Sequence, residues 1–249
     1  GVILSHRSIN TMNWLISKQA EAQAKIKHQA HFCSLTNLPN RFLAMDRLTR
    51  MIKEAQRNGS KIAALFIDLD FFKQVNDMLG HISGDKLLIE AAQRISNSVR
   101  DVDTVGRLGG DEFIVLIGVV SSTTEVNSIA KKLIDQMSDA FHIDGKELVL
   151  SASIGISMYP EDGHDRLELI RKADSAMYHS KKMGRNTYSF FTESMNLQIE
   201  RQLSIEGQLH GALERNELEV YYQQKIEIGS NRIVGAEALL RWRWEGEAV

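Results

Sequence analysis

The residues best suited to chemistry lie between 107 and 113, where the order is Arg-Leu-Gly-Gly-Asp-Glu-Phe. Apolar, β-prone residues flank this stretch, which predicts a hairpin with Asp111 and Glu112 at its tip. The two glycines permit the positive φ angles of a tight turn, and they lack the Cβ atoms that would keep an anion from the backbone. The tip could present two carboxylates to a metal ion and a phosphate. Taken alone, an ordinary Gly-Gly turn with an acidic edge is the alternative.

A second acidic pair follows an apolar run at residues 62–67 that is typical of a buried central strand. Alternation along the strand places Asp68 and Asp70 on one face. If this strand lies beside the hairpin, Asp68 meets Asp111 and Glu112, and so many carboxylates call for a divalent cation. A ligand set made only of oxygen atoms favours magnesium or manganese over zinc. Because phosphates commonly complete the coordination shell of magnesium, we expect a nucleotide to bind with the ion.

Composition narrows the remaining classes of function. The 249 residues include 43% hydrophobic and 25% charged residues, with a net charge of -2, so we expect a globular protein without affinity for nucleic acid or an anionic membrane. The one cysteine, Cys33, excludes an internal disulfide and fits a cytoplasmic setting. No apolar run is long enough to cross a bilayer, although a larger parent protein could still be tethered to a membrane.

The order of elements predicts the fold class. Residues 33–190 read as an alternation of strands and helices, in the order β-α-α-β-β-α-β-α-β after a first helix, which favours an α+β domain with one mainly antiparallel sheet and helices packed outside. The expected strands are 62–67, the two arms of the hairpin, 148–157 and 188–191, and the expected helices are 38–57, 71–78, 83–99, 124–140 and 167–183.

The two ends differ from this central domain. Residues 1–8 read as an incoming strand, and residues 11–31 as a polar helix, either a plain surface helix or a signalling stalk that pairs with a second chain. Residues 193–215 predict a connecting helix, and strands at 218–228 and 233–242 begin a further domain. The expected organisation is therefore 1–31 linker, 32–192 main domain, 193–215 connecting helix and 216–249 start of a truncated domain.

Six spaced motifs together resemble the GGDEF family of diguanylate cyclases. They are Ile67-Asp-Leu-Asp70, Phe72-Lys-Gln-Val-Asn-Asp77, Gly80-His81, Gly84-Asp85, the hairpin 107–113 and Lys181-Lys-Met-Gly-Arg-Asn186. The likeness runs from Leu35 to Phe190. It implies the palm-like, ferredoxin-like sheet shared with adenylate cyclases, in agreement with the order of elements.

The resemblance also implies the role of each site residue. Asp68, the main-chain carbonyl of Leu69 and Asp111 are similar to the magnesium ligands, with Glu112 as an auxiliary ligand. Asn76 and Asp85 resemble the residues that read guanine, because an amide and a carboxylate match its acceptor and donor edge.

Further residues of the motifs are expected around the same nucleotide. His81 lies near the base and could only shape the pocket, and Lys73 is similar to a lysine near the transferring phosphate, with a solvated helix lysine as the alternative. Lys181 and Arg185, four apart at a helix end, are expected to face the same way and bind the terminal phosphates.

The implied reaction joins two GTP molecules into cyclic di-GMP with release of pyrophosphate. A 3′-hydroxyl attacks an α-phosphate, and Asp111 takes the proton. Each domain holds one GTP, so a homodimer is needed for catalysis. A silent GTP-binding module that regulates an adjoining phosphodiesterase is the alternative function.

Arg100 and Asp103 resemble the RxxD product-inhibition site of the family, the alternative being an ordinary ion pair.

The C-terminal stretch resembles the opening of an EAL-family phosphodiesterase, which is built on a TIM-type barrel. Tyr222-Gln-Gln224 and residues 236–242 carry this likeness, and Glu237 matches the first metal-ligating glutamate of that family. The other ligands expected in the family are absent, so no hydrolysis is expected from this chain. Two positions depart from the family patterns: Cys33 stands where an aspartate is usual, and Gln224 where a proline is usual.

Overall fold

The structure is a computed structural model that describes the chain except for residues 1–13, 15–17, 20–24, 26–27, 245–246 and 249. The strand predicted at 1–8 lies outside the described residues. The described residues between 14 and 31 are helical, as predicted for that stretch, although the gaps leave much of it outside. The chain divides into two compact units, Gly1–Met195 and Asn196–Val249, and each is treated separately below.

A five-stranded sheet forms the centre of the first unit, with the strand order β2-β3-β1-β6-β7. Its strands are β1 (Lys61–Asp70), β2 (Thr104–Gly109), β3 (Glu112–Val120), β6 (Ser151–Tyr159) and β7 (Thr187–Phe190). Neighbours pair antiparallel except β6 and β7, which are parallel. The first four strands have the order of a ferredoxin-like sheet, and β7 extends one edge. The predicted α+β class with a mainly antiparallel sheet is confirmed.

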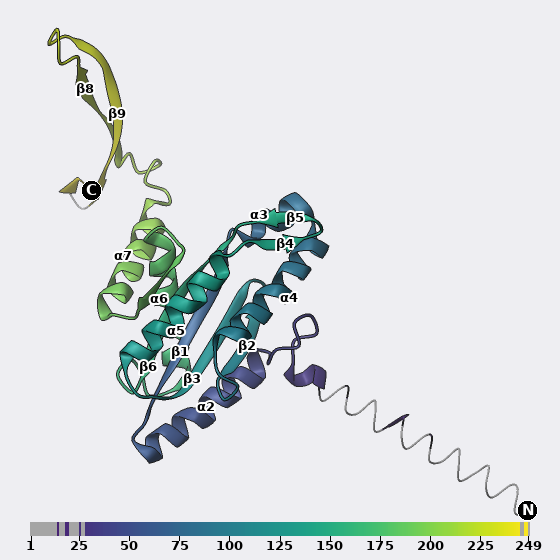
Figure 1. The fold of residues 1–249 in the computed structure, drawn as a ribbon. Coiled ribbons are helices and arrows are strands. Elements are labelled where there is room, and N and C mark those ends of the chain that lie inside the picture. The colour runs from purple at the N-terminus through teal and green to yellow at the C-terminus, as the bar shows by residue number, and fades with distance from the viewer. Residues whose placement is uncertain (1–13, 15–17, 20–24, 26–27, 245–246, 249) are drawn as a thin grey trace, which may run out of the picture. The chain divides into compact units, whose positions relative to one another are not determined.

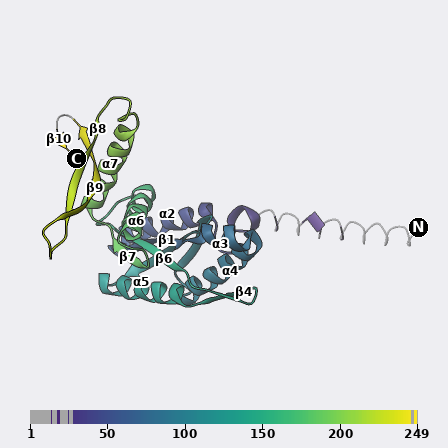
Figure 2. The same ribbon diagram turned by 90° about the horizontal axis from the view of Figure 1, so that it is seen from above.

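Helices cover both faces of this sheet (Figures 1 and 2). They are α2 (Arg41–Asn58), α3 (Phe72–Leu79), α4 (His81–Ser98), α5 (Thr123–Ser138) and α6 (Arg166–Lys182). One core joins Leu65 and Ile67 of β1 to residues of α3, α4 and α5. The other joins Ile62 and Ala64 of the same strand to α2 and α6. Successive β1 residues thus face opposite helical layers, which explains why the run is apolar throughout.

Capping residues determine both ends of α2 and the start of α6. Asn40 caps α2 by accepting a hydrogen bond from the Leu43 amide, and Gly59 ends it with a φ of 64°. Asp165 caps α6 by accepting hydrogen bonds from the amides of Leu167 and Glu168. These caps fix where α2 and α6 begin, and the two helices flank the acidic end of β1.

A short hairpin corrects the prediction between 140 and 157. Strands β4 (Phe141–Ile143) and β5 (Lys146–Leu148) pair with each other, so the single strand predicted at 148–157 is divided and β6 begins at Ser151. The turn contains Asp144 and Gly145, both with positive φ. Phe141 is fully buried beneath the guanidinium of Arg94 in α4, at 3.8 Å from the ring centroid, so the hairpin is tied to that helix.

The second unit contains most of α7 (Glu193–Leu209) and a long hairpin of β8 (Leu218–Ile226) and β9 (Ile233–Trp244), with the short β10 (Glu247–Ala248) beside β9. The helix is shorter than the 193–215 predicted, because a turn at Gly211 (φ 85°) follows its last residue closely. The indole of Trp242 is buried and donates to Glu217 at 3.0 Å. Among the described residues no helix is both long and apolar enough to cross a membrane.

Candidate active site

The pairing of β1 with β3 joins the two acidic segments. In this register Asp68 lies opposite Glu112, and the Leu69 amide donates to the carbonyl oxygen of Asp111 at 3.3 Å. The expectation that strand 62–68 lies beside the hairpin is therefore confirmed. The last residues of β1 and the hairpin tip form one edge of the sheet.

Asp68 is the most strongly perturbed carboxyl group at this edge. Burial raises its pKa to about 6, and repulsion from Asp111 and Asp70 adds to the rise. The ammonium of Lys181, which lies 2.8 Å from Asp68 Oδ2, acts in the opposite direction. Asp68 is thus a carboxylate held in a site that disfavours its charge, with a helix lysine as counter-ion.

Glu112 shares this electrostatic environment. Burial raises its pKa, repulsion from Asp174 of α6 and from Asp111 adds to the rise, and Arg41 and Lys181 oppose it. Within the part of the chain that the structure describes, no three histidine, cysteine or acidic side chains converge as a metal site. The magnesium set implied by the sequence needs only two carboxylates and a carbonyl, and its oxygen donors fit that ion. The mutual repulsion of the carboxylates around Asp68 fits it as well.

Hydrogen bonds from Arg107 hold the turn at the hairpin tip. Gly109 and Gly110 have φ values of 151° and 48°, so the turn uses the freedom of both glycines. Arg107 donates two hydrogen bonds to the carbonyl oxygen of Gly110, from Nε at 3.0 Å and from Nη2 at 2.6 Å. Its Nη1 lies 3.3 Å from the sulfur of Cys33. One side chain therefore links the turn to the segment that enters the domain.

Helices α3 and α4 bring the expected base-reading residues together. A Cβ atom at Gly84 would lie 1.9 Å from Asn76 Oδ1, so the asparagine side chain rests directly on this glycine. Asp85, next to Gly84, is exposed, as are His81 at the start of α4 and Lys73 in α3. The sequence therefore places an amide and a carboxylate around the contact between these helices.

The first turn of α4 is also held by a residue that sequence reasoning missed. Asp144, in the β4–β5 turn, accepts a hydrogen bond from Ser83 Oγ at 2.9 Å and pairs with Lys86. Ser83 and Lys86 lie on either side of Asp85 in the chain. The signal was present in the sequence, because Asp-Gly between short β-prone segments is a strong hairpin pattern.

The cations at the end of α6 are arranged differently from the prediction. Because α6 ends at Lys182, Arg185 lies beyond the helix, with a φ of 65°. The spacing of four on one helix is therefore wrong. The two cations nonetheless reach the acidic end of one strand: Lys181 pairs with Asp68, and Arg185 Nε lies 3.9 Å from Asp70 Oδ1.

Arg100 and Asp103 do not form a side-chain ion pair with each other. Asp103 Oδ2 accepts from the Arg100 amide at 3.1 Å, whereas the Arg100 guanidinium pairs with Glu125 of α5 at 2.9 Å. Asp103 thus stabilises the loop before β2 through its hydrogen bond with the Arg100 amide, and Glu125 forms the ion pair with the Arg100 side chain.

Comparisons with known proteins identify the family. The profile of the family described as "Diguanylate cyclase, GGDEF domain" matches residues 30–187. This chain belongs to the GGDEF family. The match covers β1, β2, β3 and β6 of the central sheet and all six motifs between Ile67 and Asn186, and it ends at the first residue of β7.

Relatives agree with this assignment. The chain is 46% identical over 228 residues to the bifunctional diguanylate cyclase/cyclic di-GMP phosphodiesterase MucR of Pseudomonas aeruginosa, covering 92% of this chain and 33% of MucR. It is 41% identical over 176 residues to the diguanylate cyclase TpbB of the same species, covering 70% of this chain and 40% of TpbB. The chain thus spans between a third and two fifths of the length of these relatives.

Solved structures share the fold. The GGDEF domain of TpbB superposes with a TM-score of 0.67 at 38% identity, covering 68% of this chain and 99% of that one. The GGDEF domain of DgcB from Caulobacter crescentus, in complex with c-di-GMP, superposes with a TM-score of 0.60 at 28% identity, covering 65% and 93% of the two chains. The palm-like α+β fold of the GGDEF domain is thereby established.

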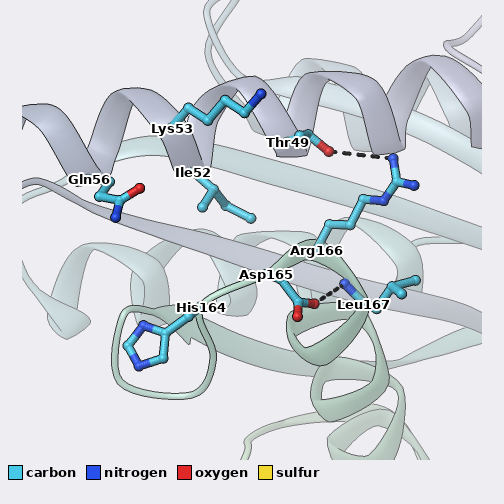
Figure 3. A pocket seen from close by; sticks show the side chains of 8 residues that line it. All are labelled: Thr49, Ile52, Lys53, Gln56, His164, Asp165, Arg166 and Leu167. Carbon is cyan, nitrogen blue, oxygen red and sulfur yellow. Dashed lines mark hydrogen bonds between the residues drawn. The ribbon is translucent and has the colours of Figure 1, made fainter.

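Two cavities of the GGDEF domain lie between α2 and α6. One, of about 600 Å³, is lined by Lys53, His164 and Arg166 among others and contains none of the predicted site residues (Figure 3). In it Arg166 extends toward Thr49 of α2, and Asp165 caps α6. The other, of about 610 Å³, includes Glu112 and so adjoins the acidic edge.

The cysteine of this GGDEF domain gives a directly measurable prediction. Burial opposes the thiolate, but hydrogen bonds from Thr36 and Arg107 outweigh it and lower the pKa of Cys33 to about 7 from an ordinary 9.0. Because the thiolate is the reactive form, the rate of alkylation by iodoacetamide should rise to half its plateau near pH 7. Arg107→Met should move that midpoint upward. A midpoint near 9 in both proteins would contradict the assigned contact.

Proposed function

We propose that this GGDEF domain is a diguanylate cyclase that condenses two GTP molecules into cyclic di-GMP and releases pyrophosphate. The observation that carries the proposal is the junction of β1 with the hairpin. It gathers Asp68, Asp111 and Glu112 at one sheet edge beside the ammonium of Lys181. Carboxylates and a cation in one place suit a bound ion and a polyphosphate.

In the proposed reaction the protein binds, orients and moves one proton. Asn76 and Asp85 hold the guanine edge, while Lys181 and Arg185 hold the terminal phosphates, with Lys73 toward the phosphate that is transferred. The 3′-oxygen of one GTP forms a bond to the α-phosphorus of the other, and the bond to pyrophosphate breaks. A second transfer in the opposite sense closes the ring and releases the second pyrophosphate. Asp111 receives the proton of the 3′-hydroxyl, and Glu112 assists from the same hairpin.

Magnesium, or manganese, fits the oxygen donors of Asp68, Asp111, Glu112 and the Leu69 carbonyl. When bound there, the ion would lower the pKa of the attacking hydroxyl and neutralise charge on the phosphates. The domain itself supplies a further positive charge for the phosphates. Lys181, which neutralises Asp68 here at 2.8 Å, would pair with the phosphates once the ion neutralises Asp68.

Two copies of the domain are required, because one site holds one GTP. The second GTP must be presented by another hairpin 107–113, so we propose a homodimer whose sites face each other. Residues 11–31, predicted from the sequence to form a helix, are proposed to raise the frequency of this encounter. The second unit is proposed to begin an EAL-type barrel, with Glu237 in β9 at its first ligand position; the many exposed apolar residues of β8 and β9 support this.

Product inhibition at Arg100 and Asp103 gives a second prediction. Cyclic di-GMP would have to displace Glu125 from the Arg100 guanidinium, since the two groups pair at 2.9 Å. Arg100→Ala should therefore abolish inhibition by added product, whereas Glu125→Gln should lower the inhibitory concentration severalfold, because a freed arginine binds phosphate more readily. Initial rates measured against added cyclic di-GMP test both. Arg50→Ala, which removes an arginine that pairs with Asp46 on α2, is the charge-matched control. Unchanged inhibition in both site variants would contradict the assignment.

The proposed function is tested by pyrophosphate release from GTP and from ATP at increasing chain concentration. We expect release from GTP with magnesium, little from ATP, and a rate per chain that rises with concentration until dimers saturate. GTP binding without release at any concentration would instead favour a regulatory module. The name of MucR joins cyclase and phosphodiesterase, so such a module beside a phosphodiesterase is the second candidate.

A further inference from the structure

Asp70 is a buried carboxylate to which the proposed reaction gives no role. It is the last residue of β1, and its side chain is 0% exposed. Its oxygens accept hydrogen bonds from Ser151 Oγ at 2.6 Å, from Ser153 Oγ at 2.8 Å and from the Asn186 amide at 3.2 Å. A carboxylate is tolerated at such a depth only when its oxygens are satisfied in this way. Asp70 therefore has a structural role, and its hydrogen-bond donors show which segments of the chain it holds together.

One of the hydrogen-bond donors to Asp70, the Asn186 amide, belongs to the turn between α6 and β7, and this turn carries Arg185. Gly184, Arg185 and Asn186 have φ values of 113°, 65° and 48°, so three consecutive residues are left-handed. Arginine adopts this conformation rarely, whereas asparagine tolerates it better, so surrounding contacts must maintain it at Arg185. The Arg185 amide donates to Ser180 O at 3.1 Å, and the Asn186 amide donates to Asp70. Asp70 is the side chain that ties this turn to the end of β1.

The same carboxylate also directs the side chain of Arg185. Arg185 Nε lies 3.9 Å from Asp70 Oδ1, and the guanidinium carbon lies 4.9 Å from the centroid of the Phe71 ring. The arginine side chain is 44% exposed, so these contacts orient it without enclosing it. An oriented and accessible guanidinium is well suited to bind phosphate oxygens.

We infer that Asp70 is a positioning residue for triphosphate recognition. By fixing residues 184–186 it presents Arg185 at the strand end that carries Asp68, where Lys181 of α6 also lies, and so lets the site distinguish a nucleoside triphosphate from a monophosphate. The inference rests on the proposed GTP site. It assigns Asp70 no contact with the nucleotide and no place in the bound ion's shell.

The test measures calorimetric affinities of the full chain for GTP and GMP in the wild type, Asp70→Asn, Arg185→Ala and the double variant. Asp70→Asn should weaken GTP binding about tenfold and leave GMP binding within about twofold, since only the triphosphate reaches Arg185. The double variant should match Arg185→Ala, because Asp70 acts through that arginine. Equal losses for GTP and GMP, or additive losses in the double variant, would overturn the inference.

Two further variants keep the test decisive. Asp162→Asn alters a half-buried carboxylate that accepts from the Met158 amide near the opposite end of β6, and it should leave the GTP to GMP ratio unchanged. If Asp70→Asn does not fold, Ser153→Ala removes one hydrogen bond and should give a smaller loss confined to GTP. A wild-type chain that binds no GTP would instead refute the proposed function. Asp70 is then tested by amide exchange, where unchanged protection at Asn186 in Asp70→Asn overturns its role.

Discussion

Replacing Gly155 with alanine should be among the most damaging single changes to this domain. A Cβ atom there would lie 2.0 Å from the carbonyl oxygen of Ala173 and 2.0 Å from the amide nitrogen of Met177, both in the backbone of α6. Backbone atoms cannot rotate away, so the helix must move off β6. We expect the free energy of unfolding to fall by about 3 kcal/mol or more. The melting temperature should fall by roughly 6–12 °C.

Gly118→Ala provides the matched control for this change. Gly118 lies in β3 of the same sheet, and its added Cβ would meet nothing closer than Met51 Cε at 3.6 Å. Its melting temperature should change little. A Gly155→Ala protein as stable as Gly118→Ala, measured by thermal denaturation, would show that α6 is not seated on β6 as described. Because α6 carries Lys181, the loss of packing should also lower GTP affinity.

Asp68→Asn should have the largest effect on activity. It removes a charged oxygen from the proposed ion site and the partner of Lys181, which lies 2.8 Å away. Changes outside a metal's own ligands commonly cost 10–100-fold, so loss of a ligand should lower the rate of pyrophosphate release at least about a hundredfold. Asp46→Asn, on the surface of α2, is the isosteric control and should retain activity. Activity within a few-fold of wild type would exclude Asp68 from the site.

The same variant has a distinct signature in stability against pH. In the wild type the pKa of Asp68 is raised to about 6 in the folded state, chiefly by burial, from an ordinary 3.8. A carboxyl group with a raised folded pKa costs stability as pH rises from its unfolded pKa through its folded one. Without added metal, Asp68→Asn should therefore gain stability relative to wild type between pH 4 and pH 8. A constant difference in melting temperature across that range would contradict the perturbed carboxyl.

The sheet and the acidic edge could be predicted from sequence because they depend on local patterns. The apolar run before Asp68 must be a central strand, and the Gly-Gly turn must be a hairpin tip. Their pairing is a condition of the predicted ion site and does not follow from the local patterns; the register of β1 with β3 shows it. The β4–β5 hairpin departs from the single strand predicted from Leu148, because the apolar run from Leu148 masks the turn that Asp144-Gly145 signals.

The partners of individual charges could not be predicted. Alternation places Asp68 and Asp70 on one face, but only tertiary structure shows that Asp70 is satisfied by Ser151, Ser153 and the Asn186 amide. Helical spacing misplaced Arg185, because the helix ends early and a left-handed turn carries the arginine back to β1. Such contacts join residues more than eighty positions apart, where no local pattern can indicate them.

Two copies of this edge are proposed to turn GTP into a cyclic dinucleotide. The most direct test is mass-spectrometric analysis of the products after incubating the wild-type chain with GTP and magnesium, beside Asp68→Asn under the same conditions. We predict cyclic di-GMP from the wild type, with two pyrophosphates for each product molecule, and essentially none from the variant. Intact GTP after prolonged incubation of the wild type at high chain concentration, or equal product from both proteins, would contradict the account.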